Sequence, residues 1–226
     1  MTQKGRLYGV GVGPGDPELL TVKAVRLLKA CDVIAIPQKD SEKCVALKIA
    51  AGAAPEALAK PILALDMPMI RDRKLRERAY AEAAERIQAL LAEGKTVVFL
   101  TLGDPSIYST YGYLHSLVHE AGYEATFVPG VTSFCAAAAA LGEPLCEDGE
   151  GLHILPGNAS ASAGLGTRVF MKGGVPEVRR MLKDHDGPVL GASNVGMDHE
   201  RLYGSLAQIP EDAGYFTLII AKEKRQ

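Results

Sequence analysis

Two turns in the sequence combine a bare backbone with an acid followed by proline. The first, Gly13-Pro14-Gly15-Asp16-Pro17, ends a run of four alternating glycines, and the second is Leu102-Gly103-Asp104-Pro105. Glycine lets a backbone approach a ligand closely. A carboxylate in such a turn can accept a proton or compensate a positive charge, which makes Asp104 the candidate catalytic residue. Either acid can instead cap a turn or a helix, and we expect that structural role for Asp16.

The glycine spacing departs from the common nucleotide-binding motifs. The dinucleotide fingerprint G-x-G-x-x-G would need a glycine at Pro14 or at Asp16. The "GKT" at 94–96 imitates the end of a phosphate-binding loop, but Ala89 stands where that loop has its first glycine. The run does contain the G-x-G-x-G of Rossmann methyltransferases, yet the next strand ends in "AIPQ" without an acid for ribose hydroxyls.

Two more segments could bind an anion. "VTSF" places Thr132 and Ser133 at the start of an alanine-rich helix, where free N–H groups suit a carboxylate; an ordinary helix cap is the alternative. The run "RDRKLRERAY" carries five cations between Arg71 and Arg78. Such a run is usually a solvated helix face, but it could also attract a polyanionic ligand.

Composition narrows the class of protein. The 226 residues include 25 Lys and Arg against 27 Asp and Glu, so no basic excess favours nucleic acid. No apolar run is long enough to span a membrane, and the N-terminus lacks the apolar stretch of a signal peptide. We therefore expect a soluble cytoplasmic protein with a small substrate. The four cysteines form no CxxC pair, so we expect no metal site and mostly buried, reduced thiols.

The first half of the chain alternates strands with helices. We expect strands in "LYGVGVG", "DVIAIP", "PILAL" and "KTVVFLTLGDP", a helix after the cap Thr21, and a long helix that ends near Gly94. This alternation predicts a mostly parallel sheet with crossover helices. Ligands bind beyond the carboxyl ends of such strands, where both glycine turns lie.

The pattern changes after residue 127, where we place a domain boundary. The predicted domains are 1–127 and 128–226. In the second we expect strands in "LHILPG", "TRVFMKGG", "GPVLGASNVG" and "GYFTLIIAKE", with a helix in "VPEVRRMLKDH". Because these strands have fewer helices between them, they favour a mixed sheet. The predicted fold is α/β, with two αβα domains.

Ordered motifs over nearly the whole chain resemble the tetrapyrrole (corrin/porphyrin) methyltransferases, which depend on S-adenosylmethionine. They are "GVGPGDPELLTVKAVRLLKACDVIAIP", "TLGDPSIYSTYGYL", "VPGVTSFCAAAAALGEPL", "VFMKGG" and "GYFTLIIAKE". The resemblance implies an active-site cleft between the two domains, S-adenosylmethionine as methyl donor, a tetrapyrrole substrate and a homodimer. It implies no metal bound by the protein itself.

The resemblance also assigns residues to the two ligands. The cofactor-binding positions that it implies are Leu102, Gly103, Asp104, Ile107, Tyr108, Thr132, Ser133, Met171, Tyr215 and Thr217. Gly13, Pro14 and Gly15 would line the tetrapyrrole side of the cleft, which belongs to the first domain. The cations Arg71, Arg73 and Arg76 would meet the carboxylates of the substrate.

The spellings "GPGDPELLT", Pro68-Met69 and "ASNVGMDHERLYGSL" look most like the members that methylate C-20 of the macrocycle in cobalamin synthesis. The expected reaction converts cobalt-factor II to cobalt-factor III on the anaerobic route, with the cobalt confined to the substrate. The metal-free precorrin-2 of the aerobic route is the second possible substrate.

Two functions of a different kind are also compatible with the pattern. One is a non-catalytic adenylate-binding protein, whose glycine turns would bind the nucleotide. The other is an RNA-directed relative, which would bind RNA with steep salt dependence. The absence of a basic excess disfavours the RNA-directed function.

Overall fold

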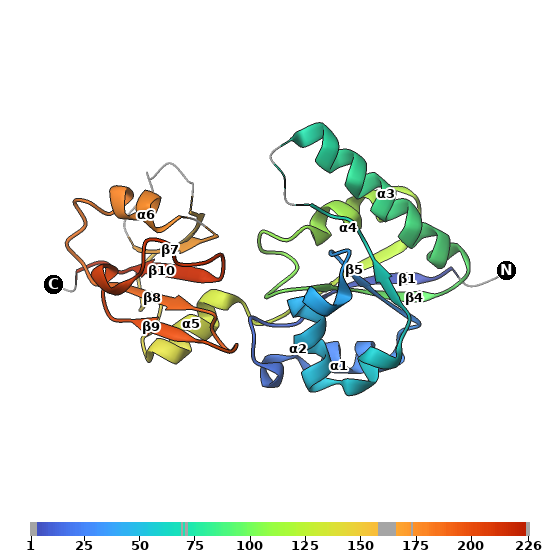
Figure 1. Ribbon diagram of the computed structural model, residues 1–226, viewed down its shortest axis with the longest axis horizontal. Coiled ribbons are helices and arrows are strands. Elements are labelled where there is room, and N and C mark those ends of the chain that lie inside the picture. The colour runs from blue at the N-terminus through green and yellow to red at the C-terminus, as the bar shows by residue number, and fades with distance from the viewer. Residues whose placement is uncertain (1–3, 69, 71, 158–165, 173, 225–226) are drawn as a thin grey trace. The chain divides into compact units, whose positions relative to one another are not determined.

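The chain separates into two compact units, each with its own sheet. The computed structural model describes residues 4–68, 70, 72–157, 166–172 and 174–224. The units comprise Met1–Thr132 and Ser133–Gln226, and their strands form two separate sheets (Figure 1).

The first unit contains a fully parallel sheet in the order β3-β2-β4-β1-β5. Its strands are β1 (Arg6–Gly11), β2 (Val33–Ile36), β3 (Ile62–Ala64), β4 (Thr96–Thr101) and β5 (Glu124–Val128). Every strand pair is parallel, which confirms the sheet predicted for this half. The central strands β1 and β4 are buried almost throughout, as expected of strands covered on both faces.

Four α-helices cover this sheet: α1 (Val22–Ala30), α2 (Val45–Ala53), α3 (Arg73–Ala92) and α4 (Tyr111–Glu120). Figure 1 draws α3 and α4 on one side of the strands and α1 and α2 on the other. Thr21 caps α1 as expected, because its hydroxyl oxygen accepts a hydrogen bond from Ala24 N at 3.1 Å. Gly94 follows α3 with φ of 81° and ends it.

The core between the sheet and the α3–α4 pair is made of large apolar side chains. Leu7 and Phe99 of the sheet are fully buried against Leu91 of α3 and Tyr111 of α4. The Tyr111 hydroxyl donates to Thr126 O at 2.8 Å, so this buried phenol is satisfied. Because Tyr111 begins α4 where the loop after β4 ends, its packing fixes the end of that loop.

The second unit contains a mixed sheet in the order β6-β7-β10-β8-β9. Its strands are β6 (Leu152–Pro156), β7 (Thr167–Met171), β8 (Val189–Ser193), β9 (Arg201–Tyr203) and β10 (Thr217–Ala221). β6 and β7 are parallel, whereas β10 runs antiparallel to both β7 and β8, which confirms the predicted mixed sheet. The helices are α5 (Ser133–Leu141) and α6 (Val175–Met181); α6 ends four residues before the predicted end at His185.

Candidate functional site

Three loops meet at the carboxyl edge of the first sheet. They follow β1, β4 and β5, which are neighbours in the sheet. The first two loops are joined by backbone: Gly103 N donates to Gly13 O at 2.8 Å, and Gly13 N donates to Gly103 O at 3.4 Å. The two glycine turns singled out in the sequence therefore lie side by side, at the edge where parallel sheets bind ligands.

The glycines at this edge allow segments of the chain to pack closely against one another. A Cβ on Gly11 would lie 2.4 Å from Gly103 O, and a Cβ on Gly130 would lie 2.2 Å from the same atom. Gly9 is bare for another reason, since a Cβ there would lie 2.3 Å from the ring of Tyr111. These glycines let the three loops and α4 pack against one another. Gly130 was not among the predicted site residues, although it lies within the motif "VPGVTSF".

The segment 13–15 is the remaining part of the first turn. Gly13 has φ of 76°, a conformation that favours glycine, and Gly13, Pro14 and Gly15 are all buried. Their assignment to the tetrapyrrole side of a cleft stays a prediction.

Asp104 is held by hydrogen bonds to both carboxylate oxygens. Oδ1 accepts from Ser106 N at 2.8 Å and from the Ser106 hydroxyl. Oδ2 accepts from Gly130 N at 2.9 Å, so Asp104 joins the loop after β4 to the loop after β5. Asp16 makes the same local turn, accepting from Glu18 N at 2.8 Å, which fits the structural role expected for it. The catalytic role of Asp104 stays a prediction, beside a structural role that the sequence also allowed.

The rest of the second loop is anchored at both ends and strained in the middle. Ile107 N donates to Asp104 O at 3.3 Å, and the hydroxyls of Thr101 and Ser109 are 2.9 Å apart. Between these anchors, Tyr108 has φ of 46° and its side chain is 47% exposed. A bulky residue seldom adopts positive φ, and such strain is concentrated at functional sites. This observation supports a ligand contact for Tyr108.

A buried hydroxyl marks the loop after β5. Thr132 Oγ1 is buried and makes no hydrogen bond with any residue that the structure describes. Ser133 is the first residue of α5. An unsatisfied buried polar atom costs free energy, so a ligand that hydrogen-bonds to Thr132 would recover part of that cost. The methionine or ribose part of S-adenosylmethionine offers suitable groups, and the contact expected at Thr132 stays a prediction.

The predicted residues of the second unit lie where β7 ends and β10 begins. Met171 is buried and pairs with Leu218 across the sheet. The Thr217 hydroxyl is 2.9 Å from the Ser193 hydroxyl, so this buried group already has a partner. Tyr215 is 46% exposed. Their assignment to the cofactor stays a prediction.

The cationic run begins helix α3. Arg71 lies outside the described residues. Arg73 pairs with Glu77 at 2.7 Å in an exposed ion pair, and Arg76 Nη1 donates to Ile70 O at 3.3 Å. Asp72 caps the helix through Leu75 N at 3.1 Å. The first turn itself contains cations and no acid, although the helix dipole favours the opposite charge there.

Among the described residues, no group of three or more His, Cys, Asp or Glu could hold a metal ion. Within the same ranges, no helix is long and apolar enough to cross a membrane. All four cysteines are free: Cys31 and Cys44 are buried, whereas Cys135 and Cys146 are exposed. The expectation of mostly buried thiols is therefore right for two of the four.

Comparison with known proteins identifies relatives that are named as C(20)-methyltransferases. The chain is 41% identical over 152 residues to a probable cobalt-precorrin-2 C(20)-methyltransferase of Methanocaldococcus jannaschii. That alignment covers 67% of this chain but 64% of the relative, less than two thirds of its length. The chain is also 36% identical over 198 residues to a precorrin-2 C(20)-methyltransferase of a Sinorhizobium species, with 79% of this chain and 78% of the relative covered.

A solved structure and a family model complete the comparison. The uroporphyrin-III C-methyltransferase of Thermus thermophilus, solved in complex with S-adenosylhomocysteine, matches with a TM-score of 0.64 at 26% identity over 96% of each chain. Residues 6–210 match the model of the tetrapyrrole (corrin/porphyrin) methylases. Since that match spans most of the chain, the protein belongs to the tetrapyrrole (corrin/porphyrin) methylase family.

Proposed function

We propose that the protein transfers a methyl group from S-adenosylmethionine to C-20 of cobalt-factor II, giving cobalt-factor III in anaerobic cobalamin synthesis. The observation that carries this proposal is the 41% identity to a relative named for cobalt-precorrin-2 and for the C-20 position. The relative from Sinorhizobium is named for the same carbon on precorrin-2. The position of methylation is thus common to both names, whereas the metal differs.

The residues at the sheet edge suit a reaction that depends on orientation. Methyl transfer is an in-line displacement, so the protein must hold donor and acceptor atoms close and collinear. We assign this task to the loop 102–108 and to Thr132, and S-adenosylmethionine supplies the methyl group. Asp104 fixes the distance between the loops after β4 and β5. A bound donor would therefore lie against a backbone that is already ordered.

The residues predicted to bind the substrate would contact a large polyanion. A tetrapyrrole precursor of this kind carries several carboxylates, and a cationic first turn on α3 would attract them. Arg73 and Arg76 are the described members of that turn named for this role. The backbone of 13–15 would then approach the macrocycle.

The metal-free substrate is the second candidate, favoured by the Sinorhizobium relative. Methyl-labelled S-adenosylmethionine is offered with cobalt-factor II and, in parallel, with precorrin-2, and label in the tetrapyrrole is counted. We expect a higher kcat/KM with cobalt-factor II. A higher value with precorrin-2 would move the protein to the aerobic reaction, and no label in either product would overturn the proposed function.

We further propose that the protein works as a homodimer in the cytoplasm. The dimer follows from the family resemblance. Its mass in solution would be twice the 24.0 kDa of one chain, which light scattering after size-exclusion chromatography measures directly.

A further inference from the structure

Lys172 has a backbone conformation that its residue type does not explain. Among the described residues, the non-glycine residues with positive φ are Tyr108, Lys172, Asn194 and His199. Asparagine and histidine adopt this region comparatively often, but lysine does not. Lys172 has φ of 57° directly after the last residue of β7. Glycine would adopt this conformation without strain, so the lysine side chain is kept at a cost.

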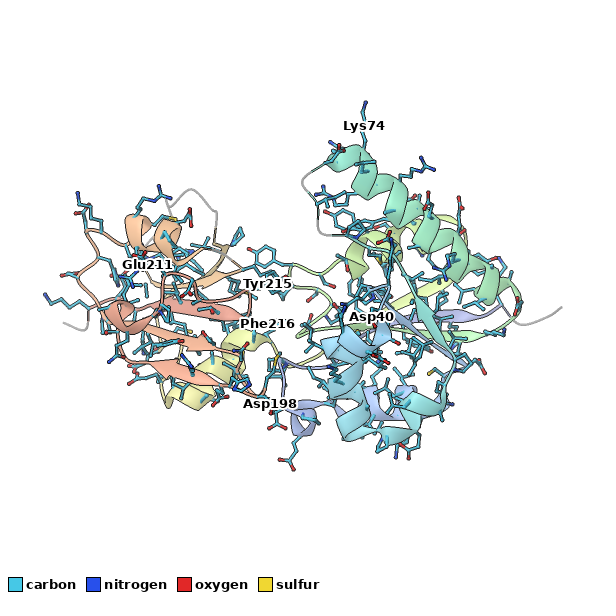
Figure 2. The ribbon with its side chains drawn as sticks, viewed as in Figure 1. Asp40, Lys74, Asp198, Glu211, Tyr215 and Phe216 are labelled. Carbon is cyan, nitrogen blue, oxygen red and sulfur yellow. The ribbon has the colours of Figure 1, made fainter. Side chains whose placement is uncertain are left out.

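The ammonium of Lys172 lies beside an aromatic ring of the neighbouring strand. Because β7 and β10 are antiparallel and Met171 pairs with Leu218, the end of β7 is next to the residues that precede β10. Lys172 Nζ is 5.8 Å from the centroid of the Tyr215 ring, within the range of a cation–π contact. Tyr215 is labelled in Figure 2, and 46% of it is exposed.

Lys172 and Tyr215 lie in partly desolvated surroundings. Burial lowers the pKa of Lys172 and raises the pKa of Tyr215. Both shifts have one cause, since a poorly hydrated place disfavours the charged form of either group. An anion bound beside Lys172 would stabilise the charged form of its amine. The attraction would be stronger there than at a fully hydrated surface.

We propose that Lys172, positioned by Tyr215, binds a carboxylate of a ligand at this edge of the second sheet. The inference rests on the proposed function, which supplies two such carboxylates. One belongs to the side chains of the tetrapyrrole, and the other belongs to the methionine part of S-adenosylmethionine. This role would explain why a lysine stands at a strained position, because its ammonium reaches the carboxylate and a glycine there would supply no charge.

Binding measurements can test this site without any methyl transfer. Uroporphyrin, a stable octacarboxylate macrocycle, and S-adenosylhomocysteine are titrated separately into the wild-type protein and into Lys172→Met. We expect Lys172→Met to weaken one of the two ligands about 10-fold or more, the effect of losing one charge-assisted hydrogen bond. Loss confined to uroporphyrin identifies the tetrapyrrole as the source of the carboxylate, and loss confined to S-adenosylhomocysteine identifies the methionine part. Unchanged affinity for both ligands would overturn the proposal.

Two further variants separate binding from folding. Lys183, an exposed lysine after α6, provides the matched control, and Lys183→Met should leave both affinities unchanged. Lys172→Gly relieves the backbone strain because glycine adopts positive φ freely, so the melting temperature of this variant should not fall even though ligand binding is lost. A destabilised Lys172→Gly variant that binds both ligands normally would show that the lysine is structural. Absence of methyl transfer by the wild-type protein, in contrast, would count against the proposed function and not against this site.

Discussion

At the scale of single residues, three side chains at the edge of the first sheet differ in how far their polar groups are satisfied within the chain. Asp104 has both carboxylate oxygens engaged within the chain. Thr132, in contrast, has a buried hydroxyl with no partner among the described residues, and Tyr108 is exposed with a strained backbone. We infer that Asp104 orders the loops and that a ligand would contact Thr132 and Tyr108. The catalytic role of Asp104 stays a prediction.

Asp104→Asn tests the role of the carboxylate. An amide offers one acceptor oxygen, so its nitrogen would face either Gly130 N or Ser106 N, both of which are donors. We expect the free energy of unfolding to fall by about 1–3 kcal/mol, measured by urea denaturation. The catalytic role predicted for Asp104 further requires kcat per folded molecule to fall about 100-fold or more. A less stable variant with normal turnover per folded molecule would instead show that Asp104 is only a structural cap.

Thr132→Val tests the unpaired hydroxyl. Removing an unsatisfied buried oxygen should leave the stability of the ligand-free protein unchanged or raise it. The same change should weaken S-adenosylhomocysteine binding about 5- to 10-fold, because one hydrogen bond of about 1 kcal/mol is lost. Thr101→Val is the contrasting control: its hydroxyl is paired with Ser109 at 2.9 Å, so that variant should lose stability. Full affinity in Thr132→Val would remove Thr132 from the binding site.

At the scale of elements, the site edge depends on loops whose backbones touch. Gly11, Gly103 and Gly130 come from three different segments of this edge, and a Cβ on Gly11 or Gly130 would collide with Gly103 O. This backbone contact, together with the hydrogen bond from Gly130 N to Asp104, fixes the positions of the turns. The alternating glycines of the sequence are therefore explained first by packing within the chain and only then by approach to a ligand.

Gly130→Ala measures that packing. The new Cβ would lie 2.2 Å from Gly103 O, so the loops must separate, and overpacking of this kind costs about 1–3 kcal/mol. Gly112→Ala is the matched control, since it lies inside α4 and a Cβ there meets no atom within 4 Å. It should stabilise the protein by about 0.5–1 kcal/mol. Equal stability of the two variants by thermal melting would contradict the packing account.

The first turn of α3 makes a separate prediction about the substrate. Replacing Arg73 and Arg76 by Gln should raise KM for the tetrapyrrole about 2- to 10-fold, the effect of losing one exposed and one partly buried cation, and leave kcat unchanged. Arg78→Gln is the control because Arg78, further along the helix, forms the same kind of exposed ion pair, with Glu82 at 2.9 Å. A rise in KM as large in the control would mean that the run is a solvated helix face with a nonspecific field.

Sequence patterns predicted most elements, and the failures have physical reasons. Strong apolar runs and the caps Thr21 and Gly94 located β1, α1 and the end of α3. The short helix α2 and strand β9 were not predicted, because a nine-residue apolar segment and a three-residue strand give little periodic signal. The positive φ of Lys172 could not be predicted from the sequence either, since nothing in the residue type indicates it.

At the scale of the whole molecule, charge and fold agree with an anionic ligand other than nucleic acid. The net charge is −2, so attraction for a polyanion must come from local groups such as the first turn of α3 and Lys172. The carboxyl edge of the parallel sheet carries the two glycine turns, and the predicted residues of the mixed sheet lie where β7 ends and β10 begins. The family to which the chain belongs acts on tetrapyrroles, and we expect the predicted residues at the two edges to bind that substrate and its methyl donor.

The position of the new methyl group tests the central claim most directly. The purified protein is incubated with S-adenosylmethionine labelled with ¹³C in its methyl group and with cobalt-factor II, and the product is examined by NMR. The account predicts one labelled methyl per macrocycle, bonded to C-20, the position named for the relatives. A labelled methyl on any other carbon, or an unlabelled macrocycle recovered beside intact donor, would contradict it.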